Sequence, residues 1–125
     1  MNAETANVRY MIDDVPAAIA FYTEHLGFTL ETDASPAFAS VVRGPLRLLL
    51  SGARSSGARP MRDGSTPGPG GWTRILVPVD DIEREVTRLR KAGLTFRNDI
   101  VKGVGGSQVL LDNPSGNPVE LFQPS

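Results

Sequence analysis

The sequence contains no cysteine, which excludes disulfides, thiolate metal sites, iron–sulfur clusters and a cysteine nucleophile. Its single histidine, His25, falls near the end of an expected helix, where we interpret it as a solvent-side polar residue, so no Ser-His-Asp triad is expected. No apolar run approaches the roughly 20 residues that a membrane span requires. With a formal net charge of −1, the chain has no overall field that would draw it to nucleic acid or to an anionic membrane.

A length of 125 residues fits one domain, and 40% hydrophobic residues are enough for a modest core. The first residues show no basic start followed by an apolar region, so we expect a cytoplasmic protein. Eleven arginines against two lysines suggest a GC-rich bacterial genome. We therefore expect no nucleic-acid partner and no membrane association.

The sequence repeats itself once, because residues 11–28 and residues 78–94 share one pattern. An Asp-Asp pair and the apolar positions that follow it recur at a shift of 67 residues. The repeated apolar positions are Val15, Ile19 and Tyr22 in the first copy and Ile82, Val86 and Leu89 in the second. Their spacing predicts one amphipathic helix in each copy, with its apolar stripe packed on a sheet.

The ends of both helices also carry matching signals. Asp14 and Asp81 precede the helices, where a carboxylate can accept the unpaired N–H groups of the first turn. Pro16 suits the first turn of a helix because its missing N–H would have no partner there. Gly27 and Gly93 follow the helices and can adopt the left-handed conformation that ends a helix.

Segments with strand character surround each helix in the same order. The expected strands are residues 8–12, 29–32, 38–42 and 46–50 in the first copy, and 75–79, 94–97, 108–111 and 119–122 in the second. We predict an α+β fold of two tandem βαβββ modules, whose curved mixed sheets surround a cavity and carry the helices on their outer faces. The first module covers about residues 7–51 and the second about residues 72–123 of a single domain, and such a cavity is a usual place for a small ligand.

A loop rich in glycine, proline and serine connects the modules, and thirteen of residues 51–71 are of these three types. This composition predicts no regular element. One interpretation is a solvated linker between the modules. The other is a flap over the cavity, in which Arg54, Arg59 and Arg62 could meet an anionic ligand.

The helix motif at residues 13–28, its repeat at residues 80–94 and the stretch LDNPSGNPVELFQ at residues 111–123 resemble the glyoxalase / bleomycin resistance / extradiol dioxygenase family, the vicinal oxygen chelate superfamily. The resemblance covers about residues 8–123. It implies paired βαβββ modules, and in the enzymes of the family it implies a divalent metal between the sheets. Its ligands are His or Gln, Glu, His and Glu on the first and last strands of each module.

This chain has lost most of the ligands that the resemblance implies. The first ligand position is Asn7, its repeat mate is Arg74, and the last ligand is Glu120. The fourth position falls on Leu48 or Leu49, with a register open by one residue. Because a guanidinium stays protonated and cannot donate a lone pair, we expect no metal and no other cofactor.

Arg74 and Glu120 are instead expected to form an ion pair, since each would otherwise be an uncompensated charge. Two roles remain open for this pair, a purely structural bridge or a bridge in which Arg74 also meets an acidic or carbonyl group of a ligand. Phe38, Trp72 and Phe122 fall on strands or at a strand entrance near the expected cavity. The candidate ligand-binding residues are Asn7, Phe38, Leu48, Trp72, Arg74, Glu120 and Phe122.

The resemblance therefore favours a metal-free binding protein of the bleomycin-resistance type, which sequesters a small aromatic or polycyclic ligand and confers antibiotic resistance. An alternative is a glyoxalase- or dioxygenase-like lyase or isomerase, with Glu120 as a weak candidate base. A third is a domain that associates with a partner chain. We further expect a homodimer, because each module leaves a sheet edge and an apolar face that need cover.

Overall fold

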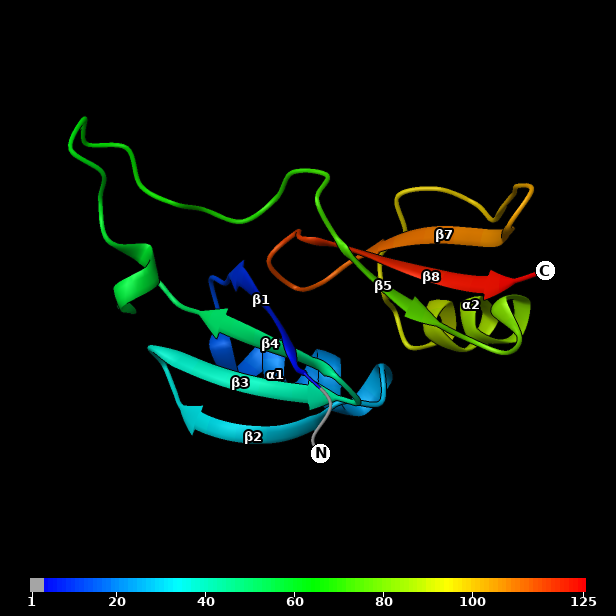
Figure 1. Cartoon of the computed structure of the whole chain (residues 1–125), viewed down its shortest axis with the longest axis horizontal. Helices are drawn as coiled ribbons and strands as arrows, with labels where there is room; N and C mark the ends of the chain where they lie inside the picture. Colours follow the sequence, from blue (N-terminus) through cyan, green and yellow to red (C-terminus); the bar gives the residue numbers. More distant parts are fainter. Residues whose placement is uncertain (1–3) are drawn as a thin grey trace. The chain divides into compact units, whose positions relative to one another are not determined.

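Each half of the chain folds into one four-stranded mixed sheet with one helix. The computed structural model describes residues 4–125, and it divides after Gly70 into module one and module two, the latter beginning at Gly71 (Figure 1). In chain order, the elements of module one are β1 (Ala6–Met11), α1 (Val15–His25), β2 (Thr29–Ala34), β3 (Phe38–Arg43), β4 (Leu46–Ser51) and η1 (Ser56–Ala58). Those of module two are β5 (Ile75–Pro78), α2 (Ile82–Lys91), β6 (Val101–Lys102), β7 (Gly106–Asp112) and β8 (Pro118–Pro124).

The two sheets have the same topology. The strand order is β1-β4-β3-β2 in module one and β5-β8-β7-β6 in module two, and in each the first strand pairs with the last in parallel. The remaining pairs are antiparallel. This architecture confirms the α+β class with two βαβββ modules. None of the helices described within residues 4–125 is long and apolar enough to cross a bilayer.

The helix signals in the sequence act as predicted. The Asp14 carboxylate accepts the N–H of Ala17 at 3.1 Å, and the Asp81 carboxylate accepts the N–H of Arg84 at 3.1 Å. Both helices are followed by a glycine with positive φ, 74° at Gly27 and 86° at Gly93. The repeated motif therefore encodes the two helix boundaries directly.

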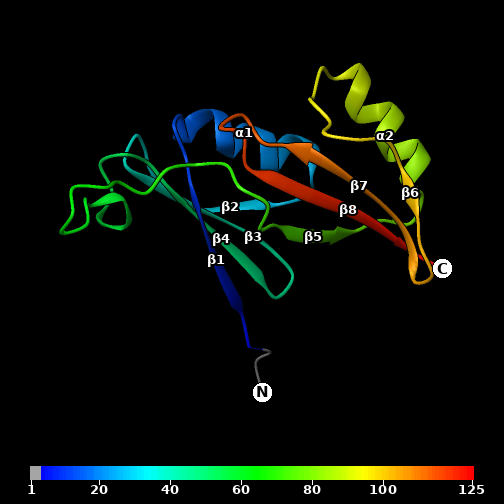
Figure 2. The same ribbon diagram turned by 90° about the horizontal axis from the view of Figure 1, so that it is seen from above.

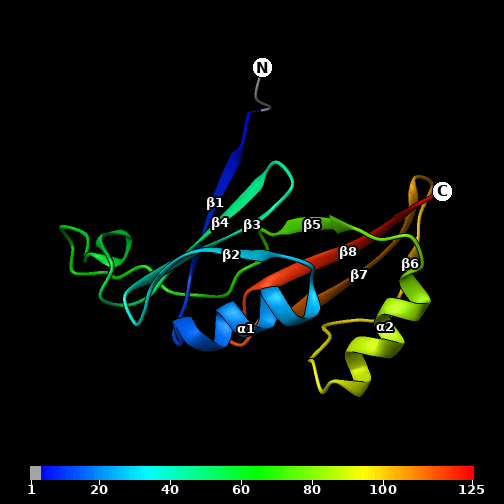
Figure 3. The same cartoon turned by 90° about the horizontal axis from the view of Figure 1, so that it is seen from below.

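The core of each module lies between its helix and its sheet. α1 runs along one face of its sheet (Figures 2 and 3) and buries Val15, Ala18 and Tyr22 there. Opposite them, Val41, Leu48 and Leu50 are fully buried. In module two, Ile82, Val86 and Leu89 of α2 are buried in the same way, as the repeat predicts.

The prediction of a strand at residues 94–97 was wrong in part. Only Phe96 forms a bridge, with Leu111, and the fourth strand of this sheet is the two-residue β6. The ladder ends there because the Asn98 side chain, rather than a backbone carbonyl, accepts the N–H of Leu110 at 2.9 Å. A side-chain acceptor in this place substitutes for the next ladder hydrogen bond.

The prediction of no regular element in the connecting loop was wrong in part, because the loop contains one short 3₁₀ turn, η1. The turn follows β4 closely, and Ser55 fixes its start by donating from both its backbone N–H and its hydroxyl to the carbonyl of Gly52, at 3.0 and 2.7 Å. Local serine hydrogen bonds of this kind favour turns over extended chain.

Candidate functional site

Apart from Leu48, the candidate site residues lie on the sheet face that is turned away from the helix of the same module. We call these the distal face of module one and the distal face of module two. Side chains alternate along a strand, and the residues paired across neighbouring strands share a face. Residues whose side chains contact one another across neighbouring strands can therefore be assigned to the same face of the sheet.

On the distal face of module one, Asn7 of β1 pairs in register with Arg47 of β4. The Asn7 side-chain oxygen accepts from Arg47 Nη1 at 3.1 Å. Arg47 also holds Glu31 with two hydrogen bonds, from Nε at 2.8 Å and from Nη2 at 3.0 Å. Ser40 donates to Glu31 at 2.8 Å. Asn7 is thus one end of a polar chain that crosses the sheet.

The hydrogen bonds along this row of polar side chains shift the pKa values of Glu31 and Arg47. The hydrogen bonds from Arg47 and then from Ser40 hold the pKa of Glu31 below its usual range. The same carboxylate raises the pKa of Arg47 above its ordinary value. Both groups therefore stay charged at neutral pH, and their charges are compensated within the module.

Sheet register decides between the two leucines of β4. Leu49 pairs with Arg9 as Glu120 pairs with Leu76, and Arg9 and Leu76 are related by the shift of 67 residues. Leu49 is therefore the counterpart of Glu120. The prediction of Leu48 as a ligand-binding residue is corrected, because Leu48 is fully buried against α1 and pairs with Val41 on the core side of the sheet.

The distal face of module two carries the predicted ion pair. Arg74, just before β5, lies with its Nη2 3.0 Å and its Nε 3.1 Å from one carboxylate oxygen of Glu120 in β8. The Arg74 side chain is 30% exposed and that of Glu120 is 10% exposed. Arg74 Nη1 also donates to the carbonyl of Trp72 at 3.3 Å. The sequence prediction of an Arg74–Glu120 contact is confirmed.

The four positions that the resemblance equates with metal ligands therefore hold Asn7, Leu49, Arg74 and Glu120. Leucine offers no donor, and Arg74 places a permanent positive charge on the one carboxylate that remains. This donor set does not fit a divalent metal. Within residues 4–125, no group of three or more histidine, cysteine, aspartate or glutamate side chains is placed to hold one.

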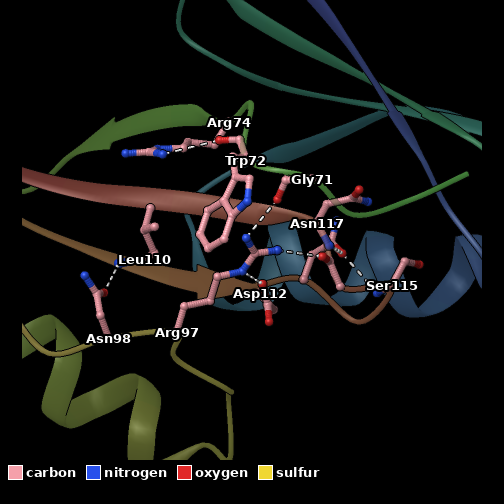
Figure 4. A network of polar contacts seen from close by, with 11 residues as sticks. Gly71, Trp72, Arg74, Arg97, Asn98, Leu110, Asp112, Ser115 and Asn117 are labelled. Atoms are coloured by element: carbon pink, nitrogen blue, oxygen red, sulfur yellow. Dashed lines mark hydrogen bonds and ion pairs between the residues drawn. The ribbon is translucent and has the colours of Figure 1, made fainter.

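Trp72 stands at the entrance to β5 and is 69% exposed. One face of its ring is covered by the guanidinium of Arg97, whose central carbon lies 4.7 Å from the ring centroid (Figure 4). Three hydrogen bonds fix Arg97, to Asp112 at 2.6 Å, to the carbonyl of Gly71 at 2.8 Å and to the carbonyl of Gly116 at 3.0 Å. The indole is thereby held as a flat surface with its other face available.

Phe38 and Phe122 are both half-buried on distal faces. Phe38 begins β3 and pairs with Ser51, while Phe122 lies in β8 between Pro78 and Gln108. Module one thus brings Asn7 and Phe38 to one face, and module two brings Trp72, Arg74, Glu120 and Phe122 to one face. Arg9, Arg47 and Arg97 were missed by the sequence reasoning, although Arg9 follows Asn7 at the strand period of two.

A pocket of about 440 Å³ lies elsewhere in module two, beside the start of α2. Asp80, Asp81, Glu83 and Lys102 line it, and Gln123 there accepts the N–H of Ile82 at 2.8 Å. Because Gln123 contacts the helix, this pocket belongs to the core side of the sheet and not to the distal face.

Comparison with known proteins gives the following matches. The model of the Glyoxalase/Bleomycin resistance protein/Dioxygenase superfamily matches residues 5–121. The fold is similar to that of a lactoylglutathione lyase from Agrobacterium tumefaciens, with a TM-score of 0.75, 23% identity, and 98% of this chain and 94% of that chain covered. It is also similar to a member of that superfamily from Sphaerobacter thermophilus DSM 20745, with a TM-score of 0.76, 26% identity and 98% of both chains covered. A third similar structure is TnmS3, an antibiotic binding protein from Streptomyces sp. CB03234, with a TM-score of 0.74, 23% identity, and 99% of this chain and 98% of that chain covered. No curated protein sequence matches the chain.

Proposed function

The chain belongs to the Glyoxalase/Bleomycin resistance protein/Dioxygenase superfamily, and from that premise we propose that it is a metal-free binding protein for a small aromatic or polycyclic molecule. The observation that carries the proposal is the Arg74–Glu120 contact of 3.0 Å. It engages the last carboxylate of the ligand set with a cation of the protein itself. Binding by shape, stacking and hydrogen bonding then remains as the function of the distal faces.

The aromatic side chains on these faces support a flat ligand. Trp72 presents a large, rigid ring, and its position is fixed by Arg97 before any ligand arrives. A surface that is ordered in advance loses little conformational entropy when a ligand stacks on it. The antibiotic binding protein from Streptomyces supports the same reading by analogy of fold. We further propose that the ligand binds between paired sheets and that the protein is a homodimer. Its proposed role is antibiotic resistance.

The alternative is a lyase or isomerase, as the similarity of fold to a lactoylglutathione lyase suggests. Glu120 would then have to act as a lone base. Its oxygen Oε1 already lies 3.0 Å from Nη2 and 3.1 Å from Nε of Arg74, so this oxygen is engaged within the protein before any substrate arrives. The alternative is therefore the weaker of the two.

A thermal-shift panel of flat polycyclic antibiotics and aromatic metabolites, run on metal-free protein, tests the proposal. A compound at 100 times its Kd adds about 2.7 kcal/mol to the free energy of unfolding, which is easily detected. Trp72 is the only tryptophan, so its fluorescence reports binding at this face directly. Trp72→Ala should abolish the shift, while Val104→Ala, at another exposed apolar side chain, should preserve it. Stabilisation that requires an added divalent metal would contradict the proposal.

A further inference from the structure

Arg9 differs from Arg47, Arg74 and Arg97 in having no acidic partner. It lies on the distal face of module one, where its Nη1 donates to the hydroxyl of Ser51 at 2.7 Å. Arg47 and Arg74 each hold a carboxylate, and so does Arg97. Within residues 4–125, no carboxylate lies within ion-pair distance of Arg9, and its other N–H groups meet no protein acceptor.

The loop after β4 holds this side chain in place. Gly57 of η1, in the green coil that follows β4 in Figure 1, lies directly against Arg9. A Cβ atom at Gly57 would be 2.7 Å from Arg9 Nη1, 3.0 Å from its Cδ and 3.2 Å from its Cζ. Only glycine allows this approach without displacing the arginine. The Arg9 side chain is therefore confined between the buried Ser51 and the η1 turn.

The surroundings of Arg9 do not compensate its charge. Residues 52–71 contain three arginines and one acidic residue, Asp63. The Asp63 carboxylate is engaged within the loop, since it accepts from the backbone N–H and the hydroxyl of Ser65 at 3.0 and 2.6 Å. In the sheet, Arg9 is paired with Leu49, and Met11 and Phe38 share its face through their pairing with Ser51. A fixed cation beside apolar side chains is the chemistry that recognises an aromatic molecule with an anionic group.

We propose that Arg9 is the anchor for an oxyanion, such as a carboxylate, on the aromatic ligand of this protein. The inference rests on the proposed function and narrows it from flat molecules in general to flat organic anions. The Nε and Nη2 groups of Arg9 can form two parallel hydrogen bonds to two oxygens of one ligand group. Ser51 and Gly57 set the direction of that fork. The loop thus contributes to recognition through its first turn.

The test compares two fluorescent dyes that share one ring system. Anilinonaphthalene sulfonate carries an anionic group, and N-phenylnaphthylamine lacks it. For Arg9→Met we expect the affinity for the anionic dye to fall at least tenfold, while the affinity for the neutral dye stays within twofold. Gly57→Ala keeps the charge but displaces the guanidinium, so a loss of threefold or more for the anionic dye alone is expected. Arg84→Met, which removes a charge at an exposed position of α2, is the matched control and should change neither affinity.

Near-ultraviolet circular dichroism must first show that each variant is folded, because partly folded chains bind both dyes. If Arg9→Met fails to fold, Arg9→Lys is used in its place. Its affinity for the anionic dye should also fall, because lysine lacks the two parallel N–H donors of the guanidinium. Equal affinities of wild type and the Arg9 variant for the anionic dye overturn the anchor and leave the proposed function standing. An equal loss for both dyes overturns it too, since the role of Arg9 is then structural. If folded wild type binds neither dye, the anchor and the proposed function fail together.

Discussion

Breaking the Arg74–Glu120 pair should destabilise module two by different amounts depending on which partner is removed. Arg74→Met leaves the Glu120 carboxylate, whose side chain is only 10% exposed, without its cation. Glu120→Leu leaves Arg74, whose side chain is 30% exposed and can turn towards water. Loss of one partner costs about 3–5 kcal/mol at a fully buried pair and exposed pairs contribute about 0.2–1 kcal/mol. We therefore expect a loss of about 2–3 kcal/mol for Arg74→Met and about 1 kcal/mol for Glu120→Leu.

The double variant should recover part of the loss, because it leaves no unpaired charge and keeps a similar volume. A double-mutant cycle measured by urea unfolding should give a coupling energy of about 1–2 kcal/mol. The Arg47–Glu31 pair of module one, with side chains 33% and 37% exposed, provides a control cycle with smaller coupling. If the Arg74–Glu120 coupling is zero, or if Glu120→Leu costs more than Arg74→Met, the reasoning from exposure is wrong.

Three further outcomes are expected. Elemental analysis of protein expressed in metal-supplemented medium should find far less than one equivalent of zinc, manganese, nickel or iron, and a full equivalent lost with Glu120→Gln would refute this. Light scattering should give twice the chain mass of 13.4 kDa, whereas a monomer at micromolar concentration would rule out the dimer. Because the pKa of Glu31 is lowered on folding, its contribution to stability is present above its unfolded value of about 4.3 and is lost as pH falls through the folded value. Thermal unfolding between pH 7 and pH 3 should therefore show a smaller decrease in Tm for Arg47→Met than for wild type, and parallel curves would contradict the assignment.

Local signals explain why so much of the fold could be predicted. The Asp14 and Asp81 caps and the terminal glycines act within a single helix turn, so the sequence contains them completely. The extent of the strand expected at residues 94–97 could not be predicted in this way. It is limited by the Asn98 side chain, which accepts the backbone N–H of Leu110, twelve positions away. That competition exists only after β7 is in place.

The candidate site also contains some contacts that could be predicted from the sequence and others that could not. The Arg74–Glu120 contact could be predicted because the family resemblance places Arg74 and Glu120 at neighbouring ligand positions of one module. Arg9 could have been identified by alternation from Asn7, but its lack of an acidic partner depends on the whole module. Arg97 gives no signal at all, because its three acceptors are an aspartate and two backbone carbonyls from separate loops and strands.

The parallel pairing of the first and last strand within each sheet has a practical consequence for dividing the chain. β1 pairs with β4, and β5 pairs with β8, so the first and last strands of each module are paired within that module. No strand pair described for residues 4–125 connects one sheet to the other. A cut between Arg62 and Gly70 would therefore separate two fragments that each keep every strand pair and one capped helix. The protein is in this sense a candidate for separate expression of its two modules, each of which should keep its own sheet and helix when the chain is divided.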